Sequence, residues 1–328
     1  MSEARAEGET LLLVGTGRAA HALGFTLQEA GVRIGAVTGR SRERVEALAR
    51  DLGTHALGHR EAVPREVTTV LLLEADDAIE EVARDLGGRA FPGIVWMHAS
   101  GSRPASVLSE ASRSAGGGAV LAWHPLAVLD GRPRRLDGVT VTLSGDADAL
   151  PVGERLAGAL GGRAVRIGPD EDRVGYHLAA CLAAGHIAAL LGEATAVARA
   201  SGLGEDGEDI VEGLYGLARE AITAVRERGA AKAVTGPVVR GDVGTVKRHL
   251  AWLEREGGPG VDRDGALMAY AGGGLAAWYV RGQGTEGRPE PDGSGGWGNP
   301  GEGPVPDVLW RATSRAAARV LSGGYGAG

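Results

Sequence analysis

Apolar and polar positions along the first half of the chain follow a pattern typical of buried strands alternating with amphipathic helices. Leu11 to Val14 is a short, continuous apolar run, as expected of a strand that is buried on both faces of a parallel sheet. A helix is predicted to follow as far as about Ala30, and a second one over 41–52 with Ser41 as its N-cap. Further elements are predicted as a helix over 77–86 and strands over 32–37, 67–73, 93–98, 119–123 and 139–143. This alternation predicts an α/β fold with a doubly wound parallel sheet.

The second half of the chain shows helical patterns only. One long helix is predicted over about 173–200, and its apolar core, 178–191, is short for a membrane span and predicts a buried helix. Two more helices are predicted over 210–227 and 243–253, the latter with Asp242 as its N-cap. Glycine and proline are then frequent from Gly282 to Gly303, which predicts a flexible linker. Apolar residues return over 305–321, where one more helix is predicted.

A glycine-rich segment of the form G-x-G-x-x-A joins the first predicted strand to the first predicted helix. Gly15 permits the tight turn, Gly17 lets the backbone approach a pyrophosphate, and the small Ala20 lets the helix pack against the strand. The phosphates would lie at the helix N-terminus, where free N–H groups and the helix dipole favour an anion. The segment therefore predicts a Rossmann-like dinucleotide-binding domain, with the cofactor held by Gly15, Thr16, Gly17, Arg18, Ala19 and Ala20.

The end of the second predicted strand indicates which dinucleotide is bound. NAD enzymes usually place Asp or Glu there for the ribose hydroxyls, but this chain has no acid from Val37 to Arg42. Arg40 and Arg42 can pair with a 2′-phosphate, and Ser41 can donate a hydrogen bond to it. We therefore predict NADP(H) as the cofactor. The alternative interpretation is that both arginines are solvated residues at a helix start.

Composition narrows the classes of partner and compartment. The chain has 328 residues, enough for two domains, and a net charge of −7 with acidic and basic residues mixed along it, which argues against nucleic-acid binding. The single cysteine, Cys181, excludes an internal disulfide framework, and no close spacing of His, Asp and Glu predicts a metal site. The polar, acidic start lacks the pattern of an export signal. We expect a cytoplasmic protein with neither a metal ion nor a membrane span.

Seven sequence blocks occur in a characteristic order: Gly15-Thr16-Gly17, Asp76-Asp77-Ala78-Ile79, His98-Ala99-Ser100-Gly101, His124-Pro125-Leu126, Tyr176-His177-Leu178-Ala179-Ala180, Thr235-Gly236-Pro237 with Arg240-Gly241-Asp242, and His249-Leu250. From about Leu11 to Tyr270, the chain thereby resembles a family with a Rossmann-like N-terminal domain and a C-terminal helical domain of unknown function. That family is distantly related to pyrroline-5-carboxylate reductase and to the 6-phosphogluconate dehydrogenase superfamily. Some of its members are considered alternative ketopantoate reductases.

The resemblance and the patterns together imply a domain organisation. We predict a Rossmann-like dinucleotide-binding domain over 1–168 and an all-helical domain for substrate binding and dimerisation over 169–281. The linker follows over 282–304 and a helical tail over 305–328. The resemblance implies a homodimer formed through the helical half.

Two departures from the family pattern affect the expected activity. The family usually has Ser-Asn in the long helix, where this chain has Ala184-Gly185, and it commonly has Val-Pro where this chain has Glu74-Ala75. If the family asparagine holds the substrate or polarises a carbonyl, this protein lacks that group.

Candidate site residues follow from what a reductase requires. Hydride transfer to a ketone or imine needs a nicotinamide, a proton donor and a group that holds the substrate. Ser100, with His98, and also His124 follow predicted strands, at the sheet edge where ligands bind in such folds. Ser100 is predicted to contact the cofactor, His177 to donate a proton or bind a carboxylate, and Arg240 to bind the substrate carboxylate. His124 is expected to be structural, because Pro125 suggests a fixed loop.

Three functions fit these residues. The leading hypothesis is an NADPH-dependent oxidoreductase that reduces a small, carboxylate-bearing keto acid similar to ketopantoate. The second is an imine reductase of the pyrroline-5-carboxylate type. The third is an NADP-binding sensor or scaffold without turnover, which the Ala184-Gly185 departure favours.

Overall fold

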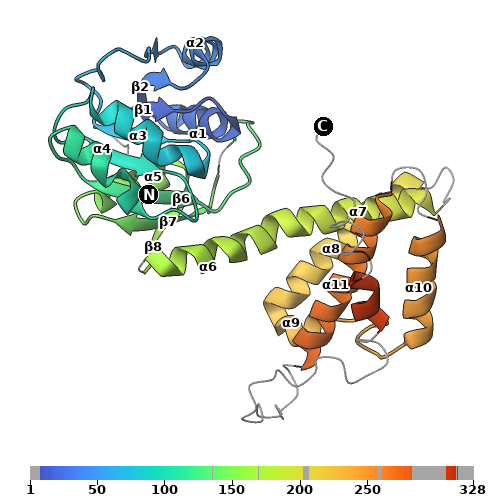
Figure 1. Ribbon diagram of the computed structural model, residues 1–328. Coiled ribbons are helices and arrows are strands. Elements are labelled where there is room, and N and C mark those ends of the chain that lie inside the picture. The colour runs from blue at the N-terminus through green and yellow to red at the C-terminus, as the bar shows by residue number, and fades with distance from the viewer. Residues whose placement is uncertain are drawn as a thin grey trace. The chain divides into compact units, whose positions relative to one another are not determined.

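The computed structural model describes residues 8–134, 136–168, 170–201, 207–256, 261–282, 308–314 and 316 (Figure 1). The chain divides into two compact units, Met1–Ala184 and Gly185–Gly328. The linker predicted at 282–304 lies outside the described residues apart from Gly282. The described part of the predicted tail is helical at 308–314 and 316.

The first unit is built on an eight-stranded sheet with the order β3-β2-β1-β4-β5-β6-β7-β8. All neighbouring strands from β3 to β6 are parallel, whereas β7 runs antiparallel to β6 and parallel to β8. The predicted doubly wound sheet is confirmed, and the two strands β7 and β8 add a reversed pair at one edge. The strands are β1 (Thr10–Val14), β2 (Arg33–Thr38), β3 (His55–Ala56), β4 (Thr69–Leu72), β5 (Val95–His98), β6 (Val120–Pro125), β7 (Thr140–Gly145) and β8 (Arg163–Arg166).

Helices cover both faces of this sheet, because alternate side chains of each buried strand point to opposite faces. In β1, Leu11 and Leu13 pack with α1, α2 and α5, whereas Leu12 and Val14 pack with α3, α4 and the turn before α4. Each of these β1 side chains is fully buried. The helices are α1 (Arg18–Glu29), α2 (Arg42–Asp51), α3 (Ile79–Gly87), α4 (Ser109–Ser114) and α5 (Leu150–Ala159), with 3-10 turns η1 (Asp76–Ala78) and η2 (Ala105–Leu108).

The second half is helical, as predicted. Two predicted N-caps are confirmed, Ser41 for α2 in the first unit and Asp242 for α10 in the second. The Ser41 side chain accepts a hydrogen bond from the Arg44 N–H, and the Asp242 side chain accepts one from the Thr245 N–H. A buried cluster that includes Val246, from α10, and Leu309 forms the core of the helical unit. The elements are α6 (Asp170–Cys181), the π-helical turn η3 (Leu182–His186), α7 (Ile187–Ala200), α8 (Gly207–Arg228), α9 (Ala230–Ala233), α10 (Val243–Glu256) and α11 (Arg263–Gly282).

The long helix over α6, η3 and α7 is confirmed, but the prediction that its apolar core is buried is wrong. Within the described residues, Arg173–Ala200 is the one helix long and apolar enough to cross a membrane by length and composition, and its most apolar window is not buried at all. Leu178 and Leu182 are both more than half exposed. An apolar run predicts apolar side chains that are stabilised by burial. It does not indicate whether residues of the same chain bury them.

Candidate functional site

The turn between β1 and α1 has the geometry that the glycine pattern predicts. Gly15 has a φ of +122°, and a Cβ atom there would lie 2.7 Å from the carbonyl oxygen of Leu73. Its N–H group donates to the Thr38 carbonyl oxygen over 2.8 Å, which ties the turn to the end of β2. A side chain at this position would therefore meet both an unfavourable backbone conformation and a backbone atom of the neighbouring strand.

Space is left open where α1 begins. Gly17 is the N-cap of α1, and a Cβ atom there would meet nothing within 4 Å. The first turn of α1 carries no acid, and the first N–H groups of a helix have no partner within that helix. Thr16, Arg18 and Ala19 lie at this opening, while Ala20 is fully buried. The geometry fits an anionic group bound by backbone N–H groups.

The three residues predicted to select the cofactor occupy the β2–α2 connection. The Ser41 side chain caps α2, and the exposed Arg42 pairs through Nε with Glu46 over 2.7 Å. Arg40 lines a cavity of about 240 Å³ together with Val14, at the end of β1, and Val82, on α3. Arg42 lines a neighbouring cavity of about 260 Å³. Both arginines therefore line cavities, and carboxylates line the same cavities, namely Glu74, Glu81 and Asp85 in the first and Glu46 and Glu61 in the second.

His98 is held in one neutral form by its neighbours. It is fully buried at the end of β5, where its Nε2 lies 3.1 Å from the Pro104 carbonyl oxygen and its Nδ1 accepts from the Ser100 N–H. Burial lowers the pKa of His98 to about 4. The Ser100 hydroxyl oxygen accepts from the N–H groups of Ser102 and Arg103, so its own proton is left to donate. Both residues thus build the loop that follows β5.

His124 and Tyr176 form a hydrogen-bonded pair at the end of β6. The Tyr176 hydroxyl lies 2.7 Å from His124 Nδ1 and also accepts from Thr142 Oγ1 over 3.3 Å. Burial, with smaller contributions from His177 and Arg173, lowers the pKa of His124 to about 4, so the imidazole is neutral at pH 7. Burial also raises the pKa of Tyr176, which keeps the phenol protonated. The pair can therefore keep a proton on the Tyr176 oxygen, and the hydrogen bond to His124 fixes the position of that oxygen.

His177 lies beside this pair. Its ring centroid is 5.7 Å from that of His124, in an edge-to-face arrangement. A Cβ atom on Gly101 would lie 2.2 Å from His177 Cδ2, so the backbone after β5 must approach the imidazole closely and requires glycine there. The buried Arg173 joins the same region, because its Nη2 donates to the Ser100 carbonyl oxygen over 2.7 Å.

Sequence reasoning found the histidines but not the groups that position them. Tyr176, Thr142 and Arg173 were not predicted as site residues. Tyr176 adjoins His177 in sequence, and a phenol one residue from a predicted proton donor was the available signal. Nothing in the sequence pattern indicates that Thr142, on β7, lies opposite His124.

Arg240 belongs to the other compact unit. It is exposed on the turn at 236–242, where its N–H donates to the Gly236 carbonyl oxygen. Across the described ranges, no group of three or more His, Cys, Asp and Glu side chains is arranged to hold a metal ion.

Comparisons with known proteins agree with this architecture. Residues 139–263 match the model of a family described as "Domain of unknown function (DUF2520)". A search of curated proteins gave no match. The match begins at β7 of the sheet unit and extends into the helical unit, and it supports the predicted resemblance to a family with a domain of unknown function over those residues.

Several solved structures are similar to the chain, and some of their descriptions name NADP or an imine reductase. A protein from Bacteroides fragilis described as a "putative NADP oxidoreductase" has a TM-score of 0.69 at 19% identity, covering 84% of this chain and 99% of its own. An imine reductase from Pseudomonas sp. has a TM-score of 0.58 at 19% identity, with coverages of 84% and 99%. An imine reductase from Myxococcus stipitatus in complex with NADP+ has a TM-score of 0.57 at 20% identity, with coverages of 84% and 93%. At these identities the likeness establishes the fold, a Rossmann-like domain followed by a helical one.

Proposed function

We propose that this chain is an NADP(H)-dependent reductase of a small keto acid similar to ketopantoate. The observation that carries the cofactor part of the proposal is the β1–α1 turn, where Gly15 closes the turn and Gly17 leaves open space before a helix without acid in its first turn. That arrangement fits a pyrophosphate, and the neighbouring Arg40 and Arg42 fit a 2′-phosphate. Similar solved structures bear descriptions that name NADP, which supports the same cofactor.

The candidate residues have the side-chain types that such a reduction needs. Bound NADPH supplies the hydride, and the protein must supply a proton and hold the substrate. His177 is our candidate for the proton donor or a carboxylate ligand, and Arg240 for the carboxylate ligand. When His124 carries its proton on Nδ1, the Tyr176 oxygen accepts it, and the phenol O–H is free to donate. Tyr176 is therefore a second candidate for the proton donor. Ser100 has a hydroxyl proton left to donate to the cofactor.

Imine reduction is the alternative that the comparisons favour, because two of the three solved structures described above are imine reductases. Ketopantoate and 1-pyrroline-5-carboxylate both carry a carboxylate, so a carboxylate ligand fits either substrate, and the two reactions differ in whether a C=O or a C=N bond is reduced. Substrate identity therefore separates the two proposals more sharply than the fold does.

Titration of the purified full chain with NADPH and NADH, followed by fluorescence, tests the cofactor. We expect NADPH to bind at least tenfold more tightly than NADH. Arg40→Ala and Arg42→Ala should remove most of that preference, whereas Arg50→Ala, an exposed change at the other end of α2, should not. Failure to bind either nucleotide would overturn the proposal.

NADPH oxidation with ketopantoate and with 1-pyrroline-5-carboxylate tests the reaction. Turnover of the keto acid supports the leading proposal, and turnover of the imine alone supports the alternative. Tight binding of NADPH without turnover of any keto acid or imine would instead support a sensor or scaffold.

Variants of the candidate residues then test their roles. Loss of a proton donor typically lowers kcat by about 10²–10⁴-fold, so His177→Gln and Tyr176→Phe should differ sharply in kcat if only one of them donates. Arg240→Ala should raise KM for a carboxylate substrate and leave kcat nearly unchanged. His186→Gln, on the exposed π-helical turn, is the matched control for His177→Gln.

A homodimer formed through the helical half is part of the proposal. The exposed apolar side chains of α7 and α8 support it, because an exposed apolar patch typically marks an interaction surface. Analytical ultracentrifugation should give twice the mass of the 33.5 kDa chain. A monomer at micromolar concentration would contradict it.

A further inference from the structure

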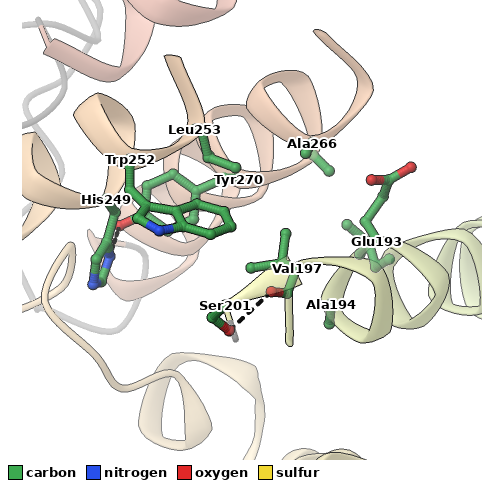
Figure 2. A pocket seen from close by; sticks show the side chains of 11 residues that line it. Glu193, Ala194, Val197, Ser201, His249, Trp252, Leu253, Ala266 and Tyr270 are labelled. Atoms are coloured by element: carbon green, nitrogen blue, oxygen red, sulfur yellow. Dashed lines mark hydrogen bonds between the residues drawn. The ribbon is translucent and has the colours of Figure 1, made fainter. Parts of the chain in front are cut away.

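The molecule contains two Tyr–His pairs of nearly the same geometry. In the sheet unit the Tyr176 hydroxyl lies 2.7 Å from His124 Nδ1, and in the helical unit the Tyr270 hydroxyl lies 2.7 Å from His249 Nδ1. The rings of each pair meet edge to face. The second pair lies at a cavity with an almost entirely apolar lining (Figure 2). The first pair lies at the carboxyl end of β6, where ligands bind in folds of this type.

A third group is bonded to the pair in the sheet unit. The Thr142 hydroxyl donates to the Tyr176 oxygen over 3.3 Å and to the His124 carbonyl oxygen over 3.4 Å. Tyr176 keeps its own proton, because burial raises the pKa of the phenol. Among the described residues, the Tyr176 oxygen has two hydrogen-bond partners, Thr142 and His124. Since Thr142 donates, the acceptor for the phenol proton is His124 Nδ1.

This direction of the hydrogen bonds places the imidazole proton on Nε2. Burial lowers the pKa of His124 to about 4, and a neutral imidazole carries a proton on one nitrogen only. Within the described residues, Nε2 makes no hydrogen bond, and it is not among the unpartnered polar atoms that are shielded from solvent. A ligand can therefore reach this N–H donor, which ends the chain Thr142–Tyr176–His124.

Neighbouring charges indicate which ligand group this donor suits. After burial, His177 and Arg173 contribute most to the lowering of the His124 pKa, Asp76 raises that pKa, and His98 lowers it slightly. A carbonyl oxygen accepts a hydrogen bond and becomes negative as its carbon gains hydride, so an N–H in such surroundings stabilises it increasingly. A protonated imine carries its own N–H and a positive charge, and both are unfavourable there.

We propose that His124 is a catalytic donor whose Nε2–H binds the carbonyl oxygen of a keto substrate, with Tyr176 and Thr142 as positioning residues. The inference rests on the proposed reduction and names the reduced bond as C=O. The carbonyl carbon gains hydride from the dihydronicotinamide, and the C=O π electrons move to the oxygen. That oxygen takes the Nε2 proton while Nδ1 takes the phenol proton, which leaves the charge on the Tyr176 oxygen. A solvent proton taken up at Nε2 then restores the chain.

Nitrogen-15 NMR of the histidine rings tests the tautomer in the full chain without nucleotide. At pH 7.5 we expect His124 to have an unprotonated Nδ1 and a protonated Nε2, and the spectrum of His124→Asn identifies these signals by their loss. A proton on Nδ1 would overturn the inference. Tyr176→Phe should move the Nδ1 signal towards that of an unbonded nitrogen, and an unchanged signal would refute the positioning role of Tyr176.

The role of Thr142 has a readout of its own. Its hydrogen bond lowers the pKa of Tyr176, against the larger effect of burial. Thr142→Val removes the hydroxyl at nearly constant size and should raise that pKa further in an ultraviolet titration, whereas Thr142→Ser should restore the wild-type value. Equal titrations of the valine and serine variants would show that Thr142 does not position the phenol.

Two substitutions of His124 test its role in turnover of ketopantoate. Asn brings its amide to the position of Nδ1, whereas Gln brings it near that of Nε2. Loss of a donor to a developing oxyanion lowers kcat by about 10²–10³-fold, so His124→Asn should show that loss and His124→Gln should retain at least tenfold more activity. Equal losses, or wild-type kcat in His124→Asn, would overturn the proposal. His249→Asn, in the second Tyr–His pair, is the matched control and should keep wild-type kcat.

Failure of this inference is distinguishable from failure of the proposed reduction. The His124 variants should bind NADPH with wild-type affinity, which shows that they are folded. If the wild type reduced neither ketopantoate nor 1-pyrroline-5-carboxylate, the proposed reduction would fall, and the catalytic role of His124 with it. Turnover of the imine alone, or a proton on Nδ1, would overturn only the inference about His124.

Discussion

In the sheet unit, Trp96 and Trp123 are completely buried, whereas in the helical unit Leu217 is 62% exposed and Ile222 is 55% exposed. The apolar side chains of the sheet itself are covered by helices of the same unit, which lie over both faces of the parallel strands. The exposed large apolar residues of that unit lie outside the sheet, in the segment after β6 and on α6 and η3. The helical unit has a small buried core but leaves apolar side chains of α7 and α8 in contact with solvent. An exposed apolar surface of this kind is typical of a protein interface.

This difference in exposure indicates that hydrophobic stabilisation comes from within the chain in the sheet unit and partly from a covering surface in the helical unit. In the sheet unit, burial within one chain supplies the hydrophobic free energy, so a change in the interior should affect folding or cofactor binding directly. In the helical unit, part of that free energy is available only when another surface covers the helices. Changes there should affect assembly before they affect folding.

The largest effect is expected from Gly15→Val in the sheet unit. The positive φ and the 2.7 Å approach to the Leu73 carbonyl oxygen should together abolish NADPH binding. The backbone strain alone should lower the free energy of unfolding by about 1–3 kcal/mol. Fluorescence titration and urea denaturation measure the two effects.

Gly17→Ala is the matched control for that change. It adds a methyl group where nothing lies within 4 Å, so stability should change little while NADPH binding weakens. If Gly17→Ala bound NADPH normally, the phosphates would not approach the backbone at this position.

The second effect concerns the pH dependence of the sheet unit through His98. Its pKa is lowered to about 4 in the folded protein, against about 6.5 in an unfolded chain. The unfolded state therefore binds more protons, so this stabilisation is complete above pH 6.5 and is lost as the pH falls towards 4. For such a shift the loss is on the order of 3 kcal/mol. Urea denaturation at pH 7.5 and pH 4.5 measures the change in the free energy of unfolding. Carboxylates that titrate over the same range also contribute to that change.

Two further measurements isolate His98 from those carboxylates. An NMR titration of the histidine ring protons should show His98 neutral down to about pH 4, and a midpoint near 6.5 would refute the assignment. His98→Gln should lower stability at pH 7.5 and flatten its decline at acid pH. His186→Gln, on the exposed turn, should keep the wild-type slope.

A third effect tests the exposed surface of the helical unit. Leu217→Glu places a charge where the side chain is already 62% exposed, so the fold of a single chain should tolerate it. If this surface forms a dimer, the dissociation constant should rise at least 100-fold in sedimentation equilibrium. Arg219→Glu on the same helix changes an exposed charge and should have a much smaller effect. Equal masses for Leu217→Glu and the wild type would show that this part of α8 lies outside any interface.

Features of the fold that depend on local sequence could be predicted, and features that depend on distant contacts could not. Buried strands such as 11–14 and the glycine turn were predictable, because their signals are local and each residue type has one physical use there. The two-residue strand at 55–56 and the reversal of β7 and β8 carry no local signal. The bounds of the long helix were predictable, but its exposure was not, because an apolar sequence does not indicate which residues or which partner will bury it.

The candidate site shows the same limit. His98, His124 and His177 were found because they follow strands or begin a helix, yet their chemical states depend on contacts made across the fold. The neutral state of His124 arises mainly from burial and from His177 nearby. The pair with Tyr176 joins residues 52 positions apart, which no spacing rule relates.

The smallest effect compares one helix cap from each unit. Ser41→Ala removes an acceptor for the Arg44 N–H and should lower the stability of the sheet unit by about 1 kcal/mol. Asp242→Ala removes acceptors for both the N–H and the hydroxyl of Thr245, and should lower the stability of the helical unit. Because the chain divides into two compact units, each change should move only its own transition in differential scanning calorimetry. If either substitution shifted both transitions equally, the two units would unfold as one cooperative body. In that case a partner that binds the exposed apolar surface of the helical unit would stabilise the sheet unit as well. The two units would then differ in how far their apolar side chains are buried, but not in how they unfold.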